Sequence, residues 1–223
     1  MLHWNEKNKN TPENIILIDK PKGVSSFDVI RILRKKFGVR KMGHGGTLDP
    51  LASGLMIVGI GDGTKKLTEF IKLPKVYEVE ILLGKKTATG DLEGEILEEK
   101  KISDFDAENT KRVLEEMVGK LTLPVPAYSA VKVGGQPLYK KACRGEKMEL
   151  PKKEMEIFWI KFKDCFPEDD YYVLKLEMEV ASGSYVRSIA EEIGRRLGFP
   201  ATVKELRRTE IGDFRIDEAE KLE

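Results

Sequence analysis

Hydrophobic patterns typical of strands and of helices follow one another along this chain in an irregular order. Strand-like patterns fall at residues 15–18, 55–60, 76–83, 155–162, 172–180 and 206–214. Helix-like patterns fall at residues 26–37, 64–71, 106–118, 138–144 and 184–197. Parallel sheets need a regular alternation of strands and helices, which this order lacks. We therefore predict an α+β fold in which helices flank a mixed, largely antiparallel central sheet.

The length of the chain and its first residues set the domain organisation that we expect. The chain has 223 residues, which is enough to bury a sizeable core. Residues 1–14 are polar and lack the apolar stretch of a secretory signal, and no apolar run is long enough to span a bilayer. We expect a polar tail over residues 1–14, one folded domain over residues 15–223, no membrane contact and a cytoplasmic location.

Few side chains of this chain could hold a soft metal ion. The two cysteines, Cys143 and Cys165, and the two histidines, His3 and His44, form no zinc-binding pattern. The formal net charge of +1, from 39 basic and 38 acidic residues, does not by itself predict nucleic-acid binding. Basic residues nevertheless cluster at residues 31–40, 140–144 and 204–208, and a local basic face can contact phosphates in a nearly neutral protein.

The densest chemical signal is a glycine-rich stretch, the 43–54 loop, which reads GHGGTLDPLASG. Glycines allow the backbone to approach a ligand closely, and an acid in such a loop is exposed to a substrate. Asp49 is therefore a candidate reactive carboxylate, although an isolated Leu-Asp-Pro is most often only a turn.

Two nucleotide-binding motifs and one reaction class do not fit the sequence. Residues 59–65, GIGDGTK, lack the Gly-Lys-Ser/Thr ending of a phosphate loop and complete no G-x-G-x-x-G pattern. An aspartyl phosphotransferase would need a second acid near Asp49 to hold magnesium, and Pro50, Leu51 and Ala52 follow it instead.

The 43–54 loop resembles the catalytic loop of the TruB family of pseudouridine synthases. Other segments resemble the family's motifs in the same order, and they are residues 19–26, 61–65, 75–77, 87–94, 124–132, 182–188 and 206–209. One departure is Gly63, where the family usually has Ala. Because the matches extend over nearly the whole chain, the resemblance implies the pseudouridine synthase fold and the isomerisation of uridine at position 55 in the T loop of tRNA.

The resemblance also implies roles for three catalytic residues. Asp49 matches the nucleophile, although attack on the base and attack on the ribose both stay open. Tyr77 matches the tyrosine that stacks on the target uracil; taken alone it would be assigned to the core of a strand. Arg187 matches the arginine that pairs with the catalytic acid, a role that would keep the carboxylate ionised.

Six further residues match substrate-binding positions of the family. His44 matches the histidine that helps to hold the flipped-out base, and Leu206 matches an apolar residue of the base pocket. Lys20 belongs to the motif that supports the floor of the active site. The full set is His44, Leu206, Lys20, Gly43, Thr47 and Asp91.

The reaction is redox-neutral and transfers no phosphate, so we expect no cofactor and no metal ion. The expected partner is the T arm of tRNA, bound by a monomer without a protein partner. Family members commonly carry a small C-terminal RNA-binding domain, for which we expect no room here. Two alternatives remain: an RNA-binding or tRNA-folding module without required catalysis, and a pseudouridine synthase for another RNA.

Overall fold

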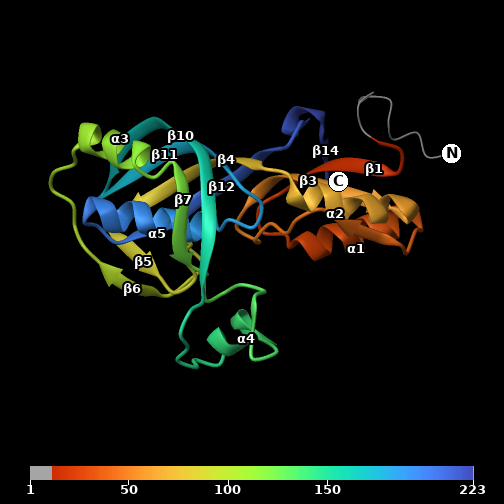
Figure 1. The fold of residues 1–223 in the computed structure, drawn as a ribbon, viewed down its shortest axis with the longest axis horizontal. Helices are drawn as coiled ribbons and strands as arrows, with labels where there is room; N and C mark the ends of the chain where they lie inside the picture. Colours follow the sequence, from red (N-terminus) through yellow and green to blue (C-terminus); the bar gives the residue numbers. More distant parts are fainter. Residues whose placement is uncertain (1–11, 223) are drawn as a thin grey trace. The chain divides into compact units, whose positions relative to one another are not determined.

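The computed structural model describes residues 12–222 of the chain, shown as a ribbon in Figure 1. These residues fall into two compact units. Unit 1 lies within Met1–Glu78 and Leu206–Glu223, and unit 2 is Val79–Glu205. Two strands, β4 (Lys75–Leu83) and β12 (Ala201–Ile211), contribute residues to both units.

Unit 1 is a small sheet with two helices. Its further elements are β1 (Ile15–Lys20), α1 (Ser26–Phe37), β2 (Met42–His44), β3 (Ser53–Ile60), η1 (Gly61–Lys66), α2 (Leu67–Lys72), β13 (Phe214–Arg215), η2 (Ile216–Glu218) and β14 (Glu220–Lys221). The strand order is β14-β1-β3-β12-β4, with β2 beside β3 and β13 beside β12. The β1–β3 and β2–β3 pairs are antiparallel, whereas the β3–β12 and β1–β14 pairs are parallel.

Apolar side chains from one side of β1 and β3 build the core of unit 1. Ile15 and Leu17 of β1 lie against Leu55 and Ile57 of β3, at the two-residue spacing of a strand face. Leu67 and Phe70 of α2, with Ile211, complete this cluster. Helix α2 is thereby packed against β1 and against β3, the strand into which the 43–54 loop leads.

Local sequence explains the bounds of α1. The Ser25 hydroxyl accepts a hydrogen bond from the Asp28 amide at the start of the helix. Gly38 ends it in a left-handed conformation with φ 66°, which glycine adopts without steric cost. Val29, Ile30 and Leu33 form the buried face.

Unit 2 is a second set of strands with three helices. Its further elements are β5 (Lys85–Thr87), β6 (Ile96–Glu99), α3 (Ala107–Glu115), β7 (Gly119–Pro124), β8 (Lys132–Val133), β9 (Gln136–Pro137), α4 (Leu138–Ala142), β10 (Lys152–Glu168), β11 (Tyr171–Val180) and α5 (Val186–Leu197). The strand order is β12-β4-β11-β10-β7, and β10 is antiparallel to both neighbours. Figure 1 shows the segment that carries α4 projecting away from the other elements of this unit.

The structure confirms the predicted α+β fold with a mixed, largely antiparallel sheet. Three element bounds differ from the expected ones. Strand β12 begins at Ala201 instead of Leu206, and α5 begins at Val186 instead of residue 184. Residues 61–66 form a 3-10 helix, so that α2 begins at Leu67 instead of residue 64. Strand β7, at residues 119–124, lies where no element was expected.

Asn14, which we expected in the polar tail, is part of the folded unit. Its carbonyl accepts a hydrogen bond from the Ile60 amide at 2.9 Å. Residues 1–11 of the expected tail lie outside the described residues. Within residues 12–222, no helix has the length and apolar character needed to cross a membrane.

Candidate active site

The 43–54 loop is bound to its surroundings on both sides of Asp49. On the N-terminal side, the buried Ser26 hydroxyl donates to the Leu48 carbonyl at 2.9 Å and accepts from the Leu48 amide at 2.8 Å. On the C-terminal side, the Pro50 carbonyl accepts from the Gly23 amide at 2.8 Å. The half-buried Asp49 carboxylate is therefore carried by a backbone that is fixed immediately before and after it.

Ser26 was missed as a site residue at the level of sequence. The Ser25-Ser26 pair offers two hydroxyls, and either could cap α1. The structure gives the cap to Ser25, which leaves Ser26 free to satisfy both backbone groups of Leu48. The doubled serine before a helix is the signal that could have indicated a second role.

Lys20 is buried beneath the 43–54 loop, where its side chain bonds to backbone carbonyls. Its side chain is 0% exposed. Its ammonium donates to the carbonyls of Val24 at 2.6 Å, Pro21 at 3.0 Å and Pro50 at 3.4 Å. Its expected place under the loop agrees with these bonds, and substrate binding by Lys20 stays a prediction.

His44 and the buried Arg208 meet at the backbone of Gly46. One terminal nitrogen of Arg208 donates to the Gly46 carbonyl at 3.2 Å. Burial lowers the pKa of His44 below its usual value, the Arg208 charge lowers it further, and the backbone of Gly46 opposes both. His44 Nδ1 is buried and has no hydrogen-bond partner among the described residues. These surroundings favour a neutral imidazole at neutral pH.

Leu206 and Tyr77 lie on the two strands that come after β3 in the order of the sheet. The loop leads into β3, Leu206 belongs to β12, and Tyr77 belongs to β4, and these three strands are consecutive neighbours in the sheet. Arg207 and Arg208 of β12 are paired in register with Ser53 and Gly54 at the end of the loop. The sheet therefore gathers three predicted site elements in unit 1.

Both side chains are nearly covered in the free protein. Tyr77 is 9% exposed and Leu206 is 8% exposed. An aromatic ring of this kind offers a stacking face, and its hydroxyl offers a polar group.

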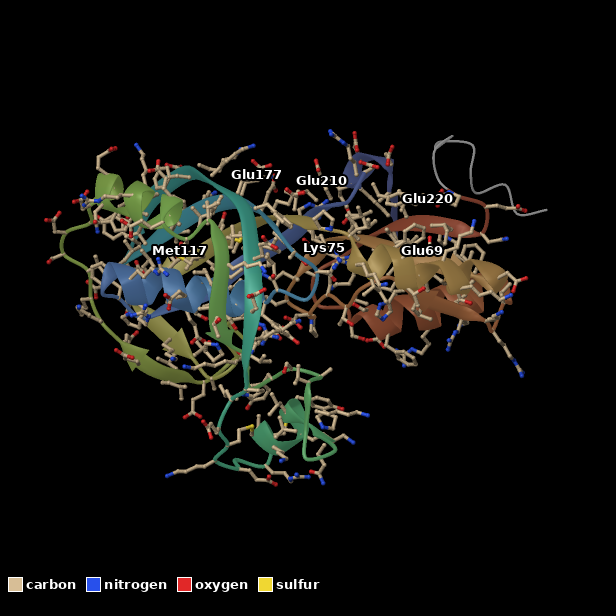
Figure 2. The ribbon with its side chains drawn as sticks, viewed as in Figure 1. Glu69, Lys75, Met117, Glu177, Glu210 and Glu220 are labelled. Carbon is tan, nitrogen blue, oxygen red and sulfur yellow. The ribbon has the colours of Figure 1, made fainter. Side chains whose placement is uncertain are left out.

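Lys75, labelled in Figure 2, begins the strand that carries Tyr77. Its buried ammonium donates to the carbonyls of Ile71 at 2.6 Å and Leu73 at 2.5 Å, at the end of α2. Burial and, to a lesser extent, the charge of Arg208 lower the pKa of Lys75 to about 8. Lys75 thus ties α2 to the start of β4, two residues before Tyr77.

Arg187 is a buried cation in unit 2. It lies in the first turn of α5, where a positive charge is unfavourable because of the helix dipole. Its guanidinium donates to the Thr89 carbonyl at 2.7 Å and to the Tyr128 carbonyl at 3.1 Å. These two loops of unit 2 hold the side chain in place.

Asp91 uses its carboxylate to hold the turn that contains Thr89, one of the residues that bind Arg187. The carboxylate accepts from the Thr89 hydroxyl at 2.5 Å and from the Glu93 amide at 3.1 Å. Asp91 is buried, and its turn includes Thr89, whose carbonyl binds Arg187. Its predicted role in substrate binding stays a prediction, and these bonds add that Asp91 holds the turn from which Thr89 binds Arg187.

The two remaining predicted residues differ in their environments. Gly43 pairs with Gly59 between β2 and β3, and a side chain there would lie 3.2 Å from Leu67. Thr47 is exposed, two residues before Asp49. Gly43 is explained by packing alone, whereas Thr47 remains available to a ligand.

The basic cluster at residues 204–208 does not form a free cationic surface. Arg208 is buried, Arg207 pairs with Asp19 at 2.8 Å, and Lys204 pairs with Glu168. In the first cluster, Arg31 pairs with Asp28 at 2.8 Å. In the third, Lys140 and Arg144 are exposed in the projecting α4 segment, where Arg144 also pairs with Glu146.

A groove of about 640 Å³ in unit 2 contains none of the predicted site residues. Several of its charged side chains are already paired, including Lys86 with Glu191 and Arg195 with Glu192. Among the described residues, no group of three or more His, Cys, Asp or Glu side chains is placed to hold a metal ion.

Comparison with known proteins identifies the family of this chain. Residues 34–186 match the family model described as TruB family pseudouridylate synthase (N terminal domain), which places the chain in the class of pseudouridylate synthases. The tRNA pseudouridine synthase B of Aquifex aeolicus is 36% identical over 211 residues, which cover 95% of this chain and 72% of that protein. The protein of the same name from Endomicrobium trichonymphae is 37% identical, over 94% of this chain and 90% of that protein.

A solved structure shows the same fold. In the crystal structure of a Cbf5-Nop10-Gar1 complex, one chain is similar with a TM-score of 0.71 and 26% identity, over 93% of this chain and 52% of that chain. The match to the family model and the identity to full relatives together show that this chain belongs to the TruB family of pseudouridylate synthases.

Proposed function

We propose that this protein isomerises uridine to pseudouridine in tRNA, at position 55 of the T loop, with Asp49 as the nucleophile. The family membership and the names of the relatives, tRNA pseudouridine synthase B, support the reaction and the class of RNA. The observation that carries the role of Asp49 is the fixation of the loop on both sides of it, through Leu48 and Pro50.

The reaction makes specific demands on the site. The bond from C1′ of the ribose to N1 of the base breaks, and a bond from C1′ to C5 forms. The proton leaves C5, and N1 gains one, so the isomerisation is balanced without an oxidant or a phosphate donor. A carboxylate that adds to the base or the ribose can divide this exchange into two easier steps.

The target base must leave the stack of the folded loop before it can react. Extrusion costs a few kcal/mol, and stacking on an aromatic ring offsets about 1–3 kcal/mol per base. We assign the stacking role to Tyr77, an aromatic side chain of β4 that is nearly covered in the free protein. A neutral His44 and the apolar Leu206 contribute to the pocket, and Arg187 takes part in the same reaction.

The protein acts, in this proposal, as a cytoplasmic monomer that needs neither a metal ion nor a cofactor. The alternatives are a binding module without catalysis and a synthase for another RNA. One chain of a Cbf5-Nop10-Gar1 complex is similar to this chain, so the test also covers a dependence on added protein partners.

The test uses the purified protein alone and an unmodified tRNA transcript. Pseudouridine is labelled chemically and located by mass spectrometry after incubation with and without EDTA. We expect one pseudouridine, at position 55, in both conditions, and none in a matched transcript with cytidine at that position. Binding without any pseudouridine would support the module, and modification only of other RNAs or only with added proteins would contradict the assignment.

A further inference from the structure

Arg208, like Lys20, is a deeply buried cation that bonds to the 43–54 loop, and the family resemblance implied no role for it in the reaction. Its side chain is 1% exposed. Its Nε donates to the Leu55 carbonyl at 2.8 Å, and a terminal nitrogen donates to the Gly46 carbonyl at 3.2 Å. One guanidinium therefore bonds to the backbone before Asp49 and to the backbone just after the loop ends.

The charge of Arg208 has no acidic partner within residues 12–222, where its two hydrogen bonds both end on carbonyl oxygens. Burying a cation without a counter-ion costs free energy, and an apolar side chain at such a position often gives a more stable protein. Stability alone is therefore a weak reason for an arginine at position 208. The planar guanidinium can donate to two separate carbonyls at once, which the ammonium group of a lysine does less well.

Backbone packing reinforces the two bonds. Gly54 is paired in register with Arg208 and has φ +110°, and an added Cβ would overlap the Arg208 carbonyl oxygen. At Gly46, where φ is +134°, an added Cβ would lie 3.6 Å from a terminal nitrogen of Arg208. The loop thus approaches Arg208 closely at two glycines, one on each side of Asp49.

We propose that Arg208 is a positioning residue for the isomerisation, holding the 43–54 loop and His44 in the geometry that the reaction needs. This inference rests on the proposed function, because Arg208 would affect the reaction only through the positions of Asp49 and His44. Arg208 does not touch the substrate and contributes no phosphate contact from its buried site.

The same guanidinium acts on His44 through its charge. His44 has a lowered pKa, first because of burial and then because of Arg208. Removing the cation should raise that pKa, whereas replacing it with another cation should leave it nearly unchanged. The titration of His44 therefore reports the charge of residue 208 separately from its hydrogen bonds.

The test compares Arg208→Met, Arg208→Lys and the control Arg215→Met, which removes an exposed arginine of the same unit. Hydrogen exchange of the free protein measures opening of residues 43–54. We expect Arg208→Met to speed exchange there about tenfold or more, as the loss of a charge-assisted hydrogen bond predicts. The catalytic rate should fall about a hundredfold with KM changed little, as for a small misplacement of reacting groups.

NMR titration adds a readout that is independent of activity. The chain has two histidines, and His3→Gln in every variant leaves His44 as the only imidazole signal. We expect the His44 pKa to rise in Arg208→Met and to remain near that of the parent in Arg208→Lys. Arg208→Lys should speed loop exchange less than Arg208→Met and should recover part of the rate.

Each outcome decides for or against the proposal. The positioning role would be overturned if Arg208→Met folds and matches Arg215→Met in both the hydrogen exchange of residues 43–54 and the catalytic rate. If Arg208→Met does not fold, Arg208→Lys decides, because parent-like exchange and rate in that variant would show that the fork is unnecessary. An inactive parent protein would refute the proposed function instead. Hydrogen exchange of residues 43–54 and the titration of His44 would then still test whether Arg208 fixes the loop.

Discussion

Gly54 should be one of the least replaceable residues of unit 1, because β12 approaches its α-carbon directly. An alanine Cβ at this position would overlap the Arg208 carbonyl oxygen and would lie 2.7 Å from the Arg208 nitrogen. Both atoms belong to backbone, so no flexible side chain can move aside. The Gly54→Ala change must therefore separate β3 from β12 or twist the end of the loop.

Two costs contribute to the expected loss of stability. A side chain at φ +110° adds strain of order 1–3 kcal/mol. Forcing a methyl group into a close-packed site costs about 1–3 kcal/mol more. Together they give roughly 2–6 kcal/mol, a large part of the approximately 5–15 kcal/mol that holds an ordinary domain together.

Gly61→Ala is the matched control for this prediction. Gly61 also has a positive φ, +55°, but nothing lies within 4 Å of the position of an added Cβ. Strain alone should cost about 1–2 kcal/mol there. Urea unfolding measures the loss of unfolding free energy in both variants. Equal losses would show that the close contact between Gly54 and Arg208 does not affect stability.

Three further predictions follow from single side chains. Ser26→Ala should lose about 1–3 kcal/mol in urea unfolding and slow turnover, because both backbone groups of Leu48 lose their partner; a loss no larger than that of Ser25→Ala would contradict this. Lys75 keeps its proton up to pH 10.5 when unfolded but only to about pH 8 when folded, so its contribution to stability should rise between these pH values. The difference in the free energy of unfolding between wild type and Lys75→Met should change by up to about 3 kcal/mol between pH 8 and pH 10.5. A difference that stays constant with pH would contradict the lowered pKa of Lys75. Tyr77→Phe should lose much more turnover than RNA binding, since the ring still stacks, and a wild-type rate would reduce Tyr77 to a stacking platform.

The sequence carried enough information to place the main elements and the loop, since these depend on local patterns. α1 begins after a capping serine and ends at a glycine, both of which can be recognised in the sequence. The 43–54 loop could be identified because its glycines and its acid are adjacent along the chain. Strand β7 was missed because the alternation of residues 119–124 is short and includes a glycine and a proline.

The supporting contacts of the site could not be predicted in the same way. Arg208 and Gly46 are far apart in the chain, and only the parallel pairing of β12 with β3 brings them together. A run such as Arg207-Arg208 suggests an exposed basic surface. The structure instead turns one arginine toward Asp19 and buries the other against the loop, a distinction that depends on strand register.

The catalytic role of Asp49 is the central claim, and one variant tests it most directly. Asp49→Asn keeps the size of the side chain but removes the carboxylate that must act as nucleophile. A single-turnover experiment with a T-arm transcript, read by mass spectrometry of labelled pseudouridine, compares it with wild type at equal RNA occupancy. We expect pseudouridine at position 55 from the wild type and none from Asp49→Asn, with RNA binding and thermal stability retained. Formation of pseudouridine by Asp49→Asn at the wild-type rate would contradict the account.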